Sequence, residues 1–187
     1  SLFDGETVDY RTPVFSIDKL PFSKKYEQTA PKFENYDYEP VKKICEIKPE
    51  IMFCENNVIR LDFKQNFAGF ISFTAKGERN TEIIVKHAEV VKEDGTFYYD
   101  NLRSAKATDR IILSGKKDKF SPKFTFHGFR YVEINIKGKA KISDIKGIVL
   151  SQDIKYGGEF NCSDEIVNVV FKNTLWGQKS NFISLPT

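Results

Sequence analysis

From residue 57 to about residue 150, apolar and polar residues alternate in short segments that glycines and polar clusters separate. Ile59, Leu61 and Phe63 are two residues apart, the spacing of one face of a half-buried strand. Further segments with strand character follow at residues 71–75, 83–87, 110–113, 124–126, 131–136, 142–150 and 158–160. Many short strands at this spacing predict an all-β, antiparallel β-sandwich or jelly roll.

The composition is that of a folded domain with a substantial core. The chain has 187 residues, of which 40% are hydrophobic, so its core needs no crosslinks. The 29 basic and 26 acidic residues are interspersed, and the net charge is +3. Nucleic-acid binding needs basic residues clustered on one face, so we expect no nucleic-acid partner. No apolar run is long enough to span a bilayer, so we expect no membrane partner either.

The cysteines Cys45, Cys54 and Cys162 are odd in number and show no paired spacing. This pattern argues against a disulfide framework and against a zinc site, and we expect free thiols. The sequence contains no signal peptide, and it does not distinguish a cytoplasmic protein from an exported one.

The two ends of the chain differ from the strand-rich centre. Residues 1–50 carry five recurring prolines, which predict an extended inter-domain segment that packs partly on the sandwich of residues 51–162. Residues 163–187 change to a helical period, with Val167, Val170, Phe171 and Leu175 on one face. Ser163 is the expected N-cap, and the helix is expected to run to about residue 180.

No catalytic motif is recognisable, and we expect no catalytic residue, metal or cofactor. His87 and His127 are the only imidazoles, and neither has another ligand at metal-binding spacing. His87 shares strand parity with apolar neighbours, which predicts a hydrogen-bonded core histidine. The carboxylates of Asp62, Glu89 and Asp109 raise the question of a hydrolytic pair, but sequence does not give their separation.

A polar stretch follows the aromatic run at residues 97–99, and such an arrangement suits either sugar binding or a structured loop. Arg130 lies in register with inward-facing residues of its strand, so it needs an acidic or carbonyl partner. The adjacent Gly128 is expected to allow a kink. Candidates for carbohydrate binding or for a domain interface are therefore Tyr98, Asn101, Arg103, His127 and Arg130.

Several blocks resemble the bacterial α-L-rhamnosidases of glycoside hydrolase family seventy-eight. Residues 62–70, reading DFKQNFAGF, resemble the family segment DFGQNFAGW, with Lys64 where the family usually has glycine. Residues 124–133, reading FTFHGFRYVE, are similar to FTYHGFRYVEV. Further similar blocks occur in family order at residues 87–90, 94–96, 101–105, 108–109 and 160–187.

This resemblance implies a concanavalin-like β-sandwich, followed in the family by an (α/α)6 barrel that carries the catalytic acids and inverts the anomeric centre. No family catalytic residue falls on this sequence, so we expect a non-catalytic fragment that is inactive by itself. The implied partners are the absent catalytic and N-terminal domains, and rhamnose-containing glycans through the parent enzyme. The alternative is a stand-alone carbohydrate-binding module for rhamnose-containing glycans.

If neighbouring domains are absent, apolar side chains at both ends of the chain lose their cover. We expect the terminal helix to expose such side chains, or a dimer to bury them. The residues concerned are Val167, Val170, Phe171, Leu175 and Trp176 in the helix, and Phe15, Leu20 and Phe22 in the proline-rich segment.

Overall fold

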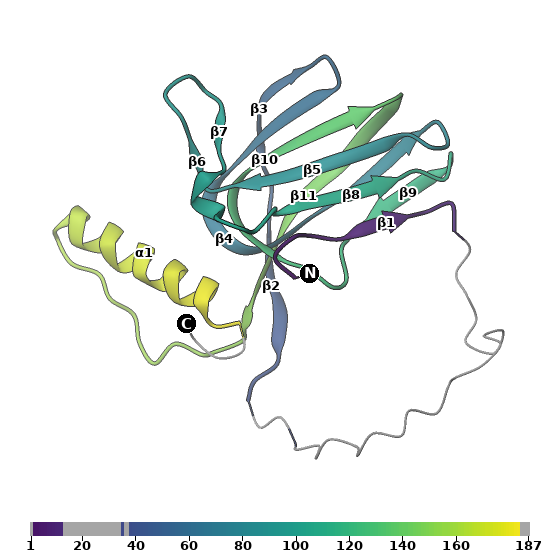
Figure 1. Ribbon diagram of the computed structural model, residues 1–187. Helices are drawn as coiled ribbons and strands as arrows, with labels where there is room; N and C mark the ends of the chain where they lie inside the picture. The colour runs from purple at the N-terminus through teal and green to yellow at the C-terminus, as the bar shows by residue number, and fades with distance from the viewer. Residues whose placement is uncertain (1, 13–34, 36–37, 184–187) are drawn as a thin grey trace.

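The structure is a computed structural model that describes residues 2–12, 35 and 38–183. The described residues form strands, a short 3-10 helix, η2 (Asp100–Leu102), and a long helix, α1 (Glu165–Asn181) (Figure 1). The strands in chain order are β1 (Thr7–Asp9), β2 (Val41–Ile47), β3 (Glu50–Glu55), β4 (Val58–Gly77), β5 (Glu82–Ala88), β6 (Val90–Val91), β7 (Phe97–Tyr98), β8 (Thr108–Ile112), β9 (Lys117–Phe120), β10 (His127–Lys137) and β11 (Ala140–Gln152).

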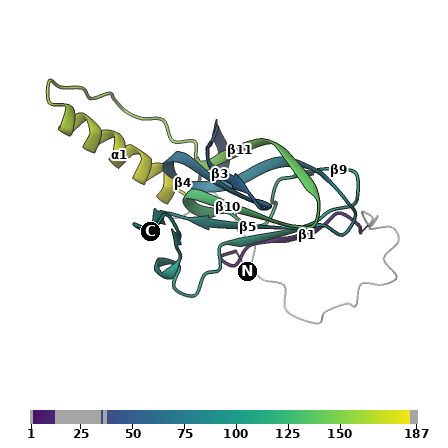
Figure 2. The ribbon, with the colours of Figure 1, turned by 90° about the horizontal axis from the view of Figure 1, so that it is seen from above.

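One curled sheet forms both layers of the sandwich, in the order β1-β8-β5-β10-β4-β11-β2. The long strand β4 belongs to both layers, because residues 58–62 pair with β3 and β10 while residues 69–77 pair with β11. Strand β9 also pairs with the second half of β4. Figure 2 shows β11 and β9 on one side of the molecule and β5 and β1 on the other. The predicted all-β, concanavalin-like sandwich is confirmed.

The core lies between these layers. Leu61, Phe73, Val132 and Ile134, all expected in the core, are at most 1% exposed, and Ile59 packs against them half-buried. Close packing here depends on Gly147, since a Cβ at this position would lie 2.6 Å from Phe67 Cζ.

Two strands come from the proline-rich region before residue 50. β2 lies at an edge of the sheet against β11, and β1 pairs with β8. The β1–β8 pair is parallel, which departs from a purely antiparallel sandwich. The three apolar residues expected to be uncovered in this region, Phe15, Leu20 and Phe22, lie outside the described residues.

Two expected strands, at residues 124–126 and 158–160, are wrong, because both stretches are irregular. The backbone N–H groups of Lys123 and Phe124 donate to the Glu6 carboxylate at 3.0 and 2.8 Å, which removes them from any strand ladder. The expected kink at Gly128 is also misplaced. The register of β10 against β4 shifts between Phe129 and Tyr131, where Arg130 alone lies opposite residues 63–66 of β4.

The terminal helix α1 begins after Asp164, so the expected N-cap at Ser163 is wrong by one residue. Asp164 Oδ1 accepts from the backbone N–H of Ile166 at 2.9 Å and of Val167 at 3.4 Å, which satisfies two otherwise free donors. Trp176 packs against the sandwich core near the end of the helix. No described helix is long and apolar enough to cross a membrane.

Exposed apolar side chains on α1 were expected, and the structure confirms them. Val167 and Val170 are 42% and 58% exposed, and Ile166 reaches 75%. Phe171, Leu175 and Trp176 are half-buried. The helix therefore presents an apolar face that the described part of the chain leaves in contact with solvent.

Candidate functional site

Three titratable side chains meet inside the sandwich at one end of the sheet. His87 lies on β5, Asp109 on β8 and His127 on β10, and these strands are neighbours. Each residue occupies an inward position of its strand, so the side chains converge between the layers. His87 and Asp109 are 0% exposed and His127 is 4% exposed.

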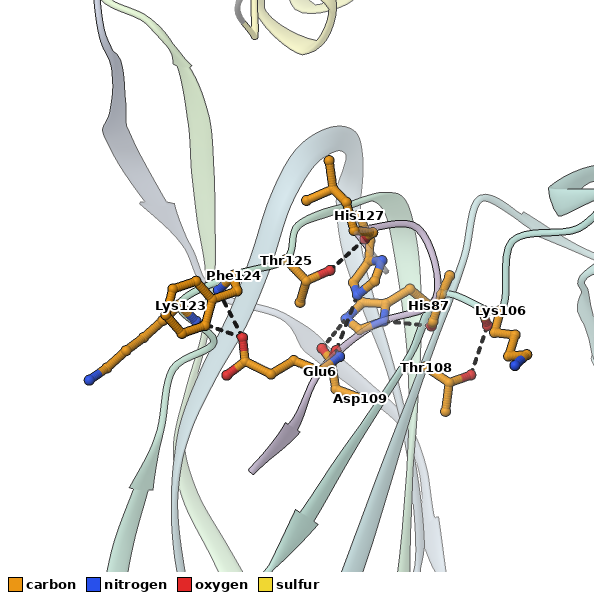
Figure 3. A network of polar contacts seen from close by, with 11 residues as sticks. Glu6, His87, Lys106, Thr108, Asp109, Lys123, Phe124, Thr125 and His127 are labelled. Carbon is orange, nitrogen blue, oxygen red and sulfur yellow. Dashed lines mark hydrogen bonds and ion pairs between the residues drawn. The ribbon is translucent and has the colours of Figure 1, made fainter. Parts of the chain in front are cut away.

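Hydrogen bonds fix the orientation of this cluster (Figure 3). His87 Nδ1 lies 2.9 Å from the carbonyl oxygen of Ala107, and His127 Nε2 lies 3.3 Å from Asp109 Oδ1. The backbone N–H of Glu6 also donates to Asp109 Oδ1, at 2.9 Å. The cluster thereby ties the N-terminal segment to strands β5, β8 and β10.

The electrostatics favour a neutral His87 and a charged Asp109. Burial, followed by the charge of His127, lowers the pKa of His87 to about 4. Burial acts to raise the pKa of Asp109, but the hydrogen bond from His127 and the two imidazoles outweigh it, and the net pKa is lowered. The predicted role of His87 as a hydrogen-bonded core histidine is confirmed.

A second buried carboxylate, Asp62, binds Arg130. Arg130 Nε and Nη2 donate to the two Asp62 oxygens at 2.9 and 3.0 Å, a bidentate pair. This hydrogen bonding lowers the pKa of Asp62 to about 2. Arg130 therefore has the acidic partner that its strand position requires.

The polar loop before β8 is anchored by Glu89. Its carboxylate accepts from Asn66 Nδ2 at 3.1 Å and from Asn101 Nδ2 at 3.0 Å. Glu89 thereby links an amide of β4 to an amide of η2. Tyr98 lies beneath the Lys92 ammonium, 5.8 Å from the ring centroid, while Arg103 is exposed at a left-handed φ of 54°.

An apolar cavity of about 250 Å³ opens beside the histidine cluster. His127 and Ala107 line it, together with Glu89 and the N-terminal residues Leu2 and Phe3. A larger cavity of about 450 Å³ lies between the end of β11 and the last turns of α1, lined by Tyr156, Gln178 and Lys179.

The five candidate residues do not form one binding surface. His127 is in the core, Arg130 is paired with Asp62, and Asn101 is bound to Glu89. Tyr98 is half-buried at the end of β7, and Arg103 is exposed in the loop that follows η2. Whether any of them touches a sugar or a neighbouring domain stays a prediction.

The carboxylates of Asp62, Glu89 and Asp109 do not have the properties of a glycosidase pair. A general acid needs a raised pKa, whereas the pKa values of Asp62 and Asp109 are both lowered. Each of the three binds a different set of neighbours in the described structure.

The convergence of His87, Asp109 and His127 is the feature that sequence reasoning missed. The two histidines are forty positions apart in the sequence and come from different strands, so no local spacing reveals them. The sequence does contain one signal, the alternation of inward and outward side chains along a strand. Each of the three residues shares the inward face of its strand with apolar neighbours.

Two family models match the chain in succession. Residues 54–151 match the bacterial α-L-rhamnosidase concanavalin-like domain, and residues 155–187 match the bacterial α-L-rhamnosidase 6 hairpin glycosidase domain. The first match ends within β11, and the second begins in the loop between β11 and α1.

Curated relatives that match this chain are named α-L-rhamnosidase. An α-L-rhamnosidase of Streptomyces avermitilis is 39% identical over 150 residues, which cover 79% of this chain and 14% of that protein. An α-L-rhamnosidase of Formosa agariphila is 31% identical over an alignment of 199 residues, which covers 100% of this chain and 21% of that protein. The chain thus spans about a fifth or less of the length of these relatives.

Solved structures agree with these matches. The α-L-rhamnosidase of Dictyoglumus thermophilum superposes with a TM-score of 0.86 at 36% identity, covering 100% of this chain and 22% of that one. That of Aspergillus terreus gives 0.83 at 31% identity, covering 100% and 23%. The family match extends over more than half of the chain and coincides with the sandwich. The chain therefore belongs to the family of the bacterial α-L-rhamnosidase concanavalin-like domain.

Proposed function

We propose that this chain is the non-catalytic β-sandwich of a larger α-L-rhamnosidase, together with the first helix of its catalytic domain. The observation that carries the proposal is the order of the two matches, the sandwich at residues 54–151 and the hairpin glycosidase domain from residue 155. In this division, residues 1–50 add strands β1 and β2 to the sheet and connect it to a preceding domain. Residues 51–162 form the rest of the sandwich, and residues 163–187 lead into the barrel.

The exposed face of α1 supports this division. Ile166, Val169 and Val170 are 75%, 45% and 58% exposed, and apolar residues in such a row on a helix normally pack against a neighbouring layer. The remaining helices of a barrel would supply that layer. The cavity between β11 and α1 then lies at the junction of the two domains.

In the proposed parent enzyme, hydrolysis of terminal α-L-rhamnosides proceeds by inversion. That reaction needs an acid and a base about 6.5–9.5 Å apart, one protonating the leaving oxygen and the other activating water. The buried carboxylates Asp62 and Asp109 are committed to Arg130 and to the histidines, so the catalytic pair comes from outside this chain. The sandwich stabilises the barrel and shapes the approach to it.

The test is an assay with a nitrophenyl α-L-rhamnoside. The 187-residue chain should show no turnover, whereas a longer product of the same gene that continues past residue 187 should release nitrophenol. Turnover by the 187-residue chain that disappears on substitution of one of its own carboxylates would contradict the proposal.

Calorimetry with L-rhamnose separates this proposal from the alternative of a stand-alone carbohydrate-binding module. The candidate residues Asn101, His127 and Arg130 already have internal partners, so we expect no saturable heat at millimolar sugar. Saturable binding that Tyr98→Ala or Arg103→Ala abolishes would favour the binding module.

A further inference from the structure

Two buried acceptor atoms face each other in the histidine cluster. Among the described residues, three buried side-chain nitrogen or oxygen atoms lack a hydrogen-bond partner, and two of them are His87 Nε2 and Asp109 Oδ2. These two atoms are 3.9 Å apart. Unpartnered polar atoms inside a core are costly, so two such atoms in opposition point to a missing positive group between them.

The hydrogen bond at Nδ1 of His87 determines whether Nε2 carries a proton or a lone pair. Nδ1 lies 2.9 Å from the Ala107 carbonyl oxygen, which only accepts, so Nδ1 carries the proton of the neutral ring. Nε2 then directs a lone pair toward the Asp109 carboxylate. A backbone carbonyl bound to the remote ring nitrogen is also how metal-ligating histidines are oriented.

His127 completes a set of two imidazoles and one carboxylate. The ligand atoms of His87, Asp109 and His127 all lie within 4.8 Å of one another, and His127 Nε2 is 3.3 Å from Asp109 Oδ1. Ligands of a tetrahedral zinc ion are separated by about 3.4 Å, since each bond is about 2.1 Å long. The distances of 3.3 and 3.9 Å are close to this value. The two imidazole rings, whose centroids are 4.3 Å apart at an interplanar angle of 32°, turn apart so that both lone pairs point at one ion.

The surroundings meet the other requirements of a metal site. The backbone N–H of Glu6 holds the Asp109 carboxylate from the N-terminal segment. The cavity of about 250 Å³ reaches the cluster at His127, which gives an ion a path to that side of the site. A proton on His87 is the competing way to join the acceptors, but it places an imidazolium in a position with no exposure to solvent.

We propose that His87, Asp109 and His127 bind one divalent transition-metal cation of the zinc class, which fastens β5, β8 and β10 together. His87 binds through Nε2 and Asp109 through Oδ2, while His127 binds through Nε2 after its proton moves to Nδ1. The ion has a structural role and takes no part in glycoside hydrolysis. Its charge of two is partly compensated by the single carboxylate.

The experiment measures zinc in the 187-residue chain after chelator treatment and dialysis against a slight excess of zinc. Mass spectrometry of the metal should give one zinc per chain, and thermal unfolding should move upward by several degrees. X-ray absorption at the zinc edge should show two imidazoles and oxygen ligands without sulfur. This measurement uses the unsubstituted chain, so it does not depend on the folding of any variant.

Substitutions locate the ion. His127→Gln, at the rim of the cavity, and Asp109→Asn should each weaken zinc binding by at least about tenfold. Asp118→Asn is the matched control, because Asp118 is also a buried strand carboxylate but bonds to Ser114, and it should keep full zinc binding.

Less than about one zinc in ten chains, with no change in unfolding temperature, would overturn the proposal and leave a proton or water between the acceptors. Zinc binding with sulfur ligands would also overturn it, because it would place the ion on the free thiols of Cys45, Cys54 or Cys162.

Discussion

At the residue scale, the buried charges of this sandwich are bound by internal partners. The Arg130–Asp62 pair shows the physical reason, since a carboxylate only 4% exposed is stable as an anion only with a matching donor. Both oxygens of Asp62 are satisfied by the guanidinium fork, and the backbone N–H of Lys64 adds a further donor at 2.6 Å. Arg130 is the single β10 residue at the register shift, next to Tyr131, which pairs with Asp62 across the two strands.

Loss of this pair should destabilise the fold. Arg130→Gln leaves Asp62 without its fork, and we expect a decrease of about 1–3 kcal/mol in the free energy of unfolding, measured with urea at pH 7. Because the folded-state pKa of Asp62 is about 2, below its ordinary value of 3.8, the pair stabilises the protein above pH 4, and this contribution is lost as the pH falls from about 4 to 2.

The substituted protein should therefore lose less stability than the original across that pH range. Arg103→Gln, on an exposed loop, is the control and should change the free energy of unfolding by less than about 0.5 kcal/mol. Equal effects of the two substitutions would argue against a specific role for the Asp62 pair.

At the element scale, strand β4 and helix α1 show how local chemistry sets boundaries. β4 can run for 20 residues because it serves two layers in turn, and Lys64, at a φ of 60°, lies where it passes between them. The family's usual glycine at this position fits the same left-handed conformation. For α1, the boundary is set by Asp164, whose side chain accepts from the first free N–H groups of the helix.

The cap gives a discriminating pair of substitutions. Asp164→Ala should lower the free energy of unfolding by about 1 kcal/mol, because two backbone donors lose their acceptor and the negative charge at the helix N-terminus disappears. Ser163→Ala should have no measurable effect. Circular dichroism during thermal unfolding of both variants measures the difference, and a larger effect at Ser163 would show that the helix begins one residue earlier.

At the scale of the whole molecule, the sandwich has a closed core, whereas the helix α1 has an exposed apolar face. The core residues between the layers are almost completely buried, whereas α1 contacts the sandwich near its C-terminal end and exposes its apolar N-terminal half. Figure 1 shows the helix extending away from the sheet. This distribution agrees with the proposal that α1 packs against a further domain of a larger enzyme.

The exposed face should make the 187-residue chain associate with itself. Light scattering should show a mass that rises with protein concentration, since Ile166 and Val170 are neighbours on one helix face and both are mostly exposed. The double substitution Ile166→Lys and Val170→Lys should reduce this association, whereas Lys172→Glu should leave it unchanged. A monomer at all concentrations would contradict the expectation.

The sequence by itself determined the fold class and the terminal helix, because strand and helix periods are local properties that survive without tertiary context. It also indicated that Arg130 needs an acidic or carbonyl partner and that His87 lies in the core. Local patterns did not place Asp164 as the cap, nor the irregular backbone at residues 124–126, where Glu6 from the other end of the chain takes the N–H groups. Only the tertiary structure decided that β1 joins the sheet in parallel and that His87, Asp109 and His127 meet. The physical reason is that strand pairing joins residues far apart in the chain, and the register of that pairing depends on the whole packed core.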